Sequence, residues 1–159
     1  RWNTSSNLDR FEGYKKALQE AGIEIQKEYV LCGEFSMEGG YREGLRIIES
    51  GNNRPTAVFC ANDAMAIGLL EACRERKVRV PEELSVIGFD DIPLSALGCI
   101  QLTTVSQSIA SLGALSGKMI IDKITNVEKR NAKQQVVLPP KLVVRRTCAR
   151  VSGEGGGNP

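Results

Sequence analysis

Four short polar segments contain the side chains whose chemistry suits the binding of a small molecule. They are Arg10, Gly33–Ser36, Asn62-Asp63 and Asp90-Asp91. Carboxylates and a guanidinium bind neighbouring hydroxyl groups in pairs, an amide both donates and accepts hydrogen bonds, and an aromatic ring such as that of Phe35 covers a ligand ring. These residue types predict a site for a neutral ligand with several hydroxyl groups.

Phosphate, metal ions and covalent intermediates fit these residues less well. The chain has no glycine-rich phosphate loop, because Gly39-Gly40 lies within a helical pattern. It also has no histidine, which excludes a Ser-His-Asp triad, a Cys-His pair and a histidine-ligated metal. We therefore expect no cofactor, no metal and no enzymatic activity. The remaining enzymatic alternative is a hydrolase that uses Asp63 and Asp90 as an acid–base pair.

Each polar residue also has a purely structural interpretation. Asn62 or Asp63 suits the N-cap of a helix, and Asp90-Asp91 suits a solvated turn. Phe35 suits the core equally well, and Arg10 suits an ordinary helix surface. Their shared position in the fold is what favours a binding site.

That position follows from an alternation of helices and strands along the chain. Apolar residues three or four apart predict helices over Asn7–Ala21, from Ser36 to Gly51, from Asn62 or Asp63 through Cys73, and over Ile109–Asn126. Apolar runs predict strands at Tyr29–Cys32, Ala57–Ala61 and Leu84–Phe89, and β-type segments at Leu102–Val105, Val136–Leu138 and Leu142–Arg145. Ser6 or Asn7 is expected to cap the first helix.

We expect an α/β fold with an open parallel sheet, strands buried on both faces, and flanking helices. Ligands bind beyond the carboxyl ends of such strands, where the polar segments fall.

The composition is that of an ordinary globular domain. The chain has 159 residues, of which 42% are hydrophobic and 25% charged, and its net charge of +2 does not favour a nucleic-acid surface. Five cysteines without a CxxC pair suggest buried, reduced thiols of a cytoplasmic protein; they are Cys32, Cys60, Cys73, Cys99 and Cys148. No apolar stretch approaches the ~18 residues of a membrane span, so no membrane partner is expected.

Several segments together identify a family. They are Pro55–Ala66, Val80–Asp91, Leu102–Val105 with Gln107, Leu112-Gly113 and Leu138–Thr147. These segments resemble the lactose/galactose-repressor family of bacterial transcription regulators, in unbroken order from Leu8 to Thr147. Two positions depart from the family pattern, since Gln101 and Ser108 stand where the family usually has proline.

The resemblance implies a periplasmic-binding-protein-like fold, in which two subdomains close over an effector. It implies effector contacts at Arg10, Asn62, Asp90 and Gln107, with Phe35 where the family often puts an aromatic ring. It also implies a dimerisation helix over Ala64–Cys73, with Ile67 and Leu70 as candidate contacts.

The resemblance also implies a domain organisation. Residues 1–107 and 141–150 would form a C-terminal effector-binding subdomain, residues 108–138 a crossover helix of the N-terminal subdomain, and residues 151–159 a disordered tail. We expect the DNA-binding headpiece and the strand before Asn7–Ala21 to be absent, as in a portion of a longer regulator.

The function implied is that of the effector-binding and dimerisation part of a cytoplasmic repressor that responds to a sugar or similar small molecule. The ligand would shift the subdomain arrangement and the operator affinity of a homodimer, which contacts DNA through the missing headpiece. The alternative is a periplasmic sugar-binding receptor of a transporter, which would use the same site for capture.

Overall fold

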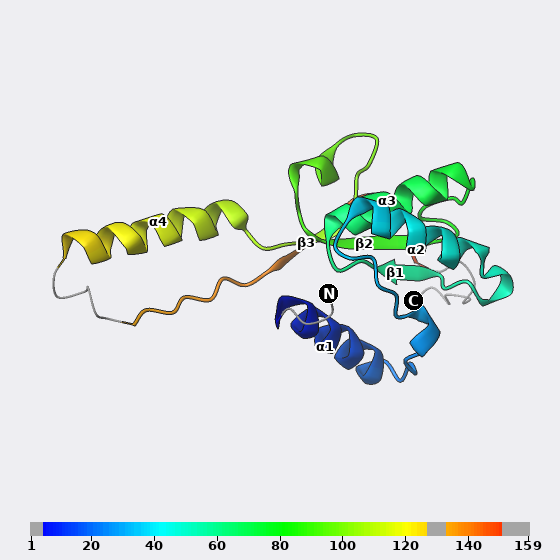
Figure 1. Ribbon diagram of the computed structural model, residues 1–159, viewed down its shortest axis with the longest axis horizontal. Coiled ribbons are helices and arrows are strands. Elements are labelled where there is room, and N and C mark those ends of the chain that lie inside the picture. Colours follow the sequence, from blue (N-terminus) through cyan, green and yellow to red (C-terminus); the bar gives the residue numbers. More distant parts are fainter. Residues whose placement is uncertain (1–4, 127–132, 151–159) are drawn as a thin grey trace, which may run out of the picture.

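The computed structural model describes residues 5–126 and 133–150, which form four helices and four strands (Figure 1). The helices are α1 (Ser5–Glu20), α2 (Met37–Glu49), α3 (Asp63–Glu75) and α4 (Ile109–Thr125). The strands are β1 (Ala57–Phe59), β2 (Ser85–Asp90), β3 (Thr103–Ser106) and β4 (Lys141–Val143). Short 3-10 helices occupy Lys27–Tyr29, Gly51–Asn53 and Pro93–Ala96.

The strands form one open sheet in the order β1-β2-β3-β4. β1, β2 and β3 are parallel, so that Phe59 lies opposite Ile87 and Asp90 lies opposite Ser106. β4 pairs with β3 in the antiparallel direction. The predicted α/β fold with an open sheet and flanking helices is confirmed, and the antiparallel edge strand is the one addition to its parallel part.

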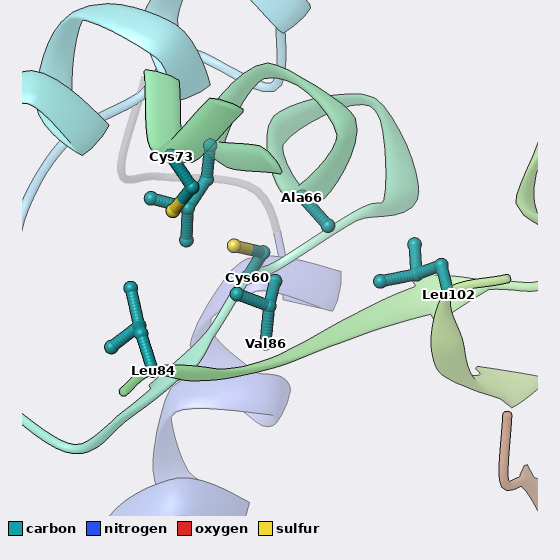
Figure 2. Packing of buried hydrophobic residues seen from close by; sticks show 7 residues of the cluster. Cys60, Ala66, Cys73, Leu84, Val86 and Leu102 are labelled. Atoms are coloured by element: carbon teal, nitrogen blue, oxygen red, sulfur yellow. The ribbon is translucent and has the colours of Figure 1, made fainter. Parts of the chain in front are cut away.

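The core lies on one face of the sheet, beneath α2 and α3. Figure 2 shows the residues of α3 and of the sheet that meet there. The buried cluster consists of Cys60, Ala66, Leu69, Cys73, Leu84, Val86 and Leu102.

Burial raises the pKa of Cys60 to about 12 and that of Cys73 to about 11, so both thiols stay protonated at neutral pH. The prediction of buried thiols is confirmed for these two, whereas Cys99 is exposed.

α1 lies on the side of the opposite face of the sheet, which is less buried. The Tyr14 ring of α1 stacks at 6.4 Å on the Phe59 ring, and Phe11 stacks on Tyr14 at 6.2 Å. Ala57 at the start of β1 remains exposed. The strands are therefore well buried on the α2/α3 face only, and the expectation of burial on both faces fails on the side of α1, which has no buried residue.

The predicted strand at Tyr29–Cys32 does not form. Tyr29 ends a 3-10 turn, and the residues after it are extended without pairing to any strand among the described residues. The apolar run favours an extended backbone, but a strand also requires a hydrogen-bonded neighbour. Val136–Leu138 likewise pairs with no strand in the part of the chain that the structure describes, whereas Lys141–Val143 pairs with β3.

The ends of the helices follow local chemistry at most positions. The Ser36 hydroxyl accepts a hydrogen bond from the Gly39 amide and caps α2. After α1 the chain turns at Gly22 with φ of +69°, a left-handed conformation that favours glycine. The expectation that Ser6 or Asn7 caps α1 is wrong, because α1 already begins at Ser5 and both residues lie inside it.

α4 extends away from the rest of the molecule (Figure 1). Its apolar side chains are accessible, with Ile120 and Ile121 each 60% exposed and Ile124 69% exposed. None of the helices described is long and apolar enough to cross a bilayer. The tail expected at 151–159 and part of the connector before Val136 lie outside the described residues.

Candidate functional site

Three of the predicted site residues meet at the carboxyl ends of the strands. Asp90, the last residue of β2, accepts hydrogen bonds at Oδ1 from Arg10 Nη2 at 3.3 Å and from Gln107 Nε2 at 2.7 Å. Arg10 comes from the second turn of α1, and Gln107 follows β3. The edge of the sheet thus gathers a guanidinium, a carboxylate and an amide from three separate elements.

The Arg10 guanidinium is held on two further sides. Its Nη1 donates to the carbonyl of Ala61 at 2.6 Å, and its central carbon lies 4.0 Å from the centroid of the Phe89 ring. Such a cation–π contact is favourable when the guanidinium is partly desolvated, and the Arg10 side chain is only 15% exposed. Phe89 is a site residue that the sequence analysis missed, although it directly precedes Asp90 in the strand.

Opposing effects act on the pKa of Asp90. Partial burial raises the pKa of its carboxyl group above the ordinary value, while the charge of Arg10 and the hydrogen bond from Gln107 lower it. Both partners therefore favour the charged form of the carboxyl group. A ligand that engages Arg10 or Gln107 would change the environment of Asp90 as well.

Asn62 and Phe35 form a second pair, linked through the backbone. Asn62 Oδ1 accepts from the Met65 amide at 2.9 Å and caps α3, while its Nδ2 donates to the carbonyl of Phe35 at 3.0 Å. The N-cap interpretation of Asn62 is thus confirmed. The Phe35 side chain lines a shallow pocket of about 40 Å³ together with Asn7, Gly33 and Glu34.

Left-handed backbone conformations concentrate at this edge of the sheet. Non-glycine residues with φ between +52° and +119° there are Glu34, Phe35, Asp90, Asp91 and Ser108. Such conformations are sparsely populated and tend to cluster at functional sites. The two departures from the family pattern also have a physical reason, because Gln101 and Ser108 have φ of +46° and +52°, which the proline ring cannot adopt.

Asp63 is a structural residue rather than part of the site. Its carboxyl group is fully buried and accepts hydrogen bonds from the Ile92 amide at 2.9 Å, Ser95 Oγ at 2.6 Å and Thr104 Oγ1 at 2.5 Å. These bonds tie α3 to the loop after β2 and to β3. Because all three come from the protein itself, the geometry gives no support to an acid–base pair of Asp63 with Asp90.

A second ion pair, between Arg145 and Asp91, also escaped the sequence analysis. Arg145 Nη2 lies 2.7 Å from Asp91 Oδ1, and Arg145 Nη1 donates to the carbonyl of Leu102 at 2.8 Å. The segment after β4 is further fixed by Thr147 Oγ1, which donates to the carbonyl of Val86 at 2.6 Å. The C-terminal segment thereby contacts Asp91 after β2, Val86 within β2 and Leu102 before β3.

The two residues predicted at a dimer interface lie on α3, away from the polar cluster. Both Ile67 and Leu70 are half-buried. Leu70 packs against the buried core of its own chain, which leaves Ile67 as the more available of the two. The dimer interface stays a prediction.

The polar cluster suits reversible binding of a polar ligand. It offers donors from Arg10 and Gln107 and acceptors from Asp90, but no activated nucleophile. Across residues 5–126 and 133–150, no group of three His, Cys, Asp or Glu side chains is arranged to hold a metal ion.

Comparison with known proteins gives a consistent result. Residues 3–148 match the model of a family described as a periplasmic binding protein-like domain. The chain is 38% identical over 151 residues to the HTH-type transcriptional regulator DegA of Bacillus subtilis, covering 92% of this chain and 42% of that protein. It is 39% identical over 140 residues to the HTH-type transcriptional repressor PurR of Serratia proteamaculans, covering 88% of this chain and 40% of the relative.

Solved structures show the same fold. A regulatory protein of the LacI family from Chloroflexus aggregans matches with a TM-score of 0.79 and 34% identity, covering 94% of this chain and 53% of that one. A LacI family transcriptional regulator from Enterococcus faecium, solved with bound ribose, matches with a TM-score of 0.78 and 32% identity, covering 92% of this chain and 53% of that one. The chain spans about two fifths of the length of the curated relatives it matches.

Proposed function

Because this chain belongs to the periplasmic binding protein-like family of LacI-type transcription regulators, we propose that it forms the effector-binding part of a repressor. The observation that carries the proposal is the cluster of Arg10, Asp90 and Gln107 at the carboxyl ends of β2 and β3. A ligand hydroxyl can donate to Asp90 in place of the Gln107 amide, which leaves the ion pair with Arg10 intact. The neighbour with bound ribose supports a sugar or a similarly polar molecule as the ligand class.

The proposed contacts extend the cluster to Asn62 and Phe35. The Asn62 amide is engaged by backbone groups on both sides, so it would act chiefly by fixing the position of Phe35. The Phe35 ring, in its shallow pocket, would then cover one side of the ligand.

The proposed mechanism is a shift between two arrangements of the full-length protein. In it, residues 1–107 and 141–150 form one subdomain, and residues 108–138 reach into another. A ligand bound between the two would favour one arrangement and so change the affinity of a cytoplasmic homodimer, joined through Ile67 and its neighbours, for operator DNA.

The test is made in the full-length regulator. A thermal-shift screen of ribose, sucrose and purine bases first identifies a ligand, since a ligand at 100 times its Kd adds about 2.7 kcal/mol of stability. Arg10→Ala and Asp90→Ala are then each expected to lower the affinity for that ligand about tenfold or more, because each removes a charged hydrogen-bonding group. Operator affinity without ligand should stay unchanged.

A matched control is available at the other end of the sheet. Arg54 forms an ion pair with Glu83 at 3.3 Å, and the exposure of these side chains is similar to that of Arg10 and Asp90. Arg54 precedes β1 and Glu83 precedes β2, so this pair lies at the amino ends of the strands. Arg54→Ala should therefore leave the ligand affinity unaltered. If Arg10→Ala and Asp90→Ala bind the ligand as well as Arg54→Ala does, the site is not the one proposed.

A further inference from the structure

The backbone at the end of β2 is held in a conformation that its residues do not prefer. Asp90 has φ of +119° and Asp91 has φ of +59°. Residues other than glycine rarely adopt this left-handed region, and they remain there only where the surrounding structure imposes it. The Asp90 carboxylate meets Arg10 and Gln107 from this backbone. Its position therefore requires other groups that fix the chain on either side of it.

The two residues after Asp90 are each bound by a side chain from a distant part of the sequence. Asp91 Oδ1 lies 2.7 Å from Arg145 Nη2, and the Ile92 amide donates to Asp63 Oδ2 at 2.9 Å. Asp63 is fully buried in α3, whereas Arg145 lies two residues after β4. Both contacts directly follow Asp90 in the chain, so together they restrict how its backbone can rotate.

Arg145 is itself anchored by contacts other than Asp91. Its backbone amide donates to Thr103 Oγ1 at 2.9 Å, and its Nη1 donates to the carbonyl of Leu102 at 2.8 Å. The Arg145 side chain is 16% exposed and that of Asp91 23%, so solvent screens their ion pair only in part. A guanidinium donates in two fixed directions at once. Arg145 therefore links Asp91 to the backbone that leads into β3.

We infer that Arg145 is a positioning residue of the candidate ligand site, which fixes the left-handed backbone at Asp91 and thereby presents the Asp90 carboxylate. Without the ion pair, the backbone would relax to an ordinary conformation and release this carboxylate into solvent. Arg10 and Gln107 bind Asp90 directly, whereas Arg145 acts on it through the backbone. The role of Arg145 rests on the proposed function of the site, but its test uses no effector, so the two can fail separately.

The pKa of Asp90 in the full-length regulator separates this role from a simple loss of positive charge. Removal of a nearby positive charge by itself raises the pKa of a carboxyl group. Release of Asp90 has the opposite sign, because partial burial, the largest influence on its pKa, raises it above 3.8 in the folded chain. Arg145→Ala is therefore expected to lower the pKa of Asp90 toward 3.8. The measurement is a carbon-13 NMR titration of labelled aspartate carboxyl groups, with the signal assigned from Asp90→Asn.

Two substitutions of Asp91 test the backbone directly and serve also if Arg145→Ala does not fold. Asp91→Ala and Asp91→Gly remove the same charge and the same ion pair. Glycine adopts φ of +59° freely, whereas alanine is disfavoured there about tenfold. The pKa of Asp90 is therefore expected to stay higher in Asp91→Gly than in Asp91→Ala. Asp91→Gly should also restore a raised pKa of Asp90 when it is combined with Arg145→Ala.

The matched control is Arg146→Ala, which removes the same charge one residue later from an exposed side chain. It should not lower the pKa of Asp90. A pKa of Asp90 that rises or stays constant in Arg145→Ala would overturn the positioning role, as would a decrease of equal size in Arg146→Ala. Equal values in Asp91→Ala and Asp91→Gly would overturn it as well. If the expected changes occur but Asp90→Ala leaves effector binding intact, the positioning role stands and the proposed function of the site fails.

Discussion

Asp90 shows how one residue at the site depends on its neighbours. Its pKa is raised by partial burial and lowered by the charge of Arg10 and the hydrogen bond from Gln107. Arg10→Ala and Gln107→Ala should each raise the pKa of Asp90 further, because each removes an interaction that favours the charged form. A carbon-13 NMR titration of the carboxyl group measures this directly. An Asp90 pKa that falls, or stays constant, in Arg10→Ala would contradict the observed contact.

The raised pKa of Asp90 determines the direction in which the stability of the fold changes with pH. A carboxyl group whose pKa is higher in the folded than in the unfolded state contributes its stability at low pH and loses it as the pH rises through the folded pKa. For Asp90 this loss begins near the ordinary value of 3.8 and extends above it. Asp90→Asn should remove this part of the pH dependence.

Asp63 lies one residue after Asn62 in the sequence and has a different role. Asn62 reaches the edge of the sheet, whereas Asp63 points into the core and joins Ser95 and Thr104. Of these adjacent polar residues, Asn62 caps α3 and contacts the Phe35 backbone, whereas Asp63 is buried among hydroxyl groups of its own chain. The sequence identifies the pair, but the direction of each side chain depends on where α3 begins.

At the scale of elements, α2 and α3 pack through glycines. A Cβ atom added at Gly68 of α3 would lie 2.0 Å from the Met37 carbonyl oxygen, and one at Gly40 of α2 would lie 2.2 Å from the Met65 carbonyl oxygen. The backbones of the two helices thus approach more closely than any larger residue allows. Both glycines of the Gly39-Gly40 pair lie in a helix as expected. Gly40 serves this packing, whereas a Cβ atom at Gly39 would lie 2.0 Å from the Gly33 carbonyl oxygen.

Gly68→Ala should therefore destabilise the chain. Alanine gains about 1 kcal/mol of helix propensity over glycine, but the clash with backbone atoms typically costs 1–3 kcal/mol or more. Because a Cβ 2.0 Å from a backbone oxygen places the clash in the upper part of this range, we expect a net loss of about 1–2 kcal/mol in the free energy of unfolding, measured by urea denaturation. Gly13→Ala in α1, where a Cβ would meet nothing within 4 Å, is the control and should be neutral or stabilising. Equal effects of both substitutions would contradict the close approach.

At the scale of the whole molecule, stability resides in the α2/α3 face of the sheet. Leu69 in the core is 2% exposed, whereas Ile124 in α4 is 69% exposed. Leu69→Ala is expected to cost about 2–5 kcal/mol, because it leaves a cavity in packed surroundings. Ile124→Ser is expected to change the free energy of unfolding by less than about 0.5 kcal/mol.

The comparison of these two variants by denaturant unfolding tests whether α4 packs on the rest of the chain. A loss in Ile124→Ser approaching that in Leu69→Ala would show that α4 has a packing partner in solution. The apolar side chains of α4 form the kind of exposed surface that proteins use for contact with another domain.

The sequence by itself determined the local features and the family. Periodicity located the four helices, the apolar runs located β1, β2 and β3, and Ser36 and Asn62 cap the helices they precede. The motifs identified a family that the comparisons confirm. These features are predictable because each depends on residues a few positions apart, whose backbone preferences and side-chain spacing are visible in the chain.

Only the tertiary structure decided which residues meet. Arg10 and Asp90 are 80 residues apart in the sequence, and Arg145 reaches Asp91 across 54. The apolar run at Tyr29–Cys32 favours a strand locally but has no hydrogen-bonded neighbour strand among the described residues. Phe89 lies under Arg10 because of the position of α1. Hydrogen-bond partners and burial are set by the path of the whole chain, so no local pattern contains them.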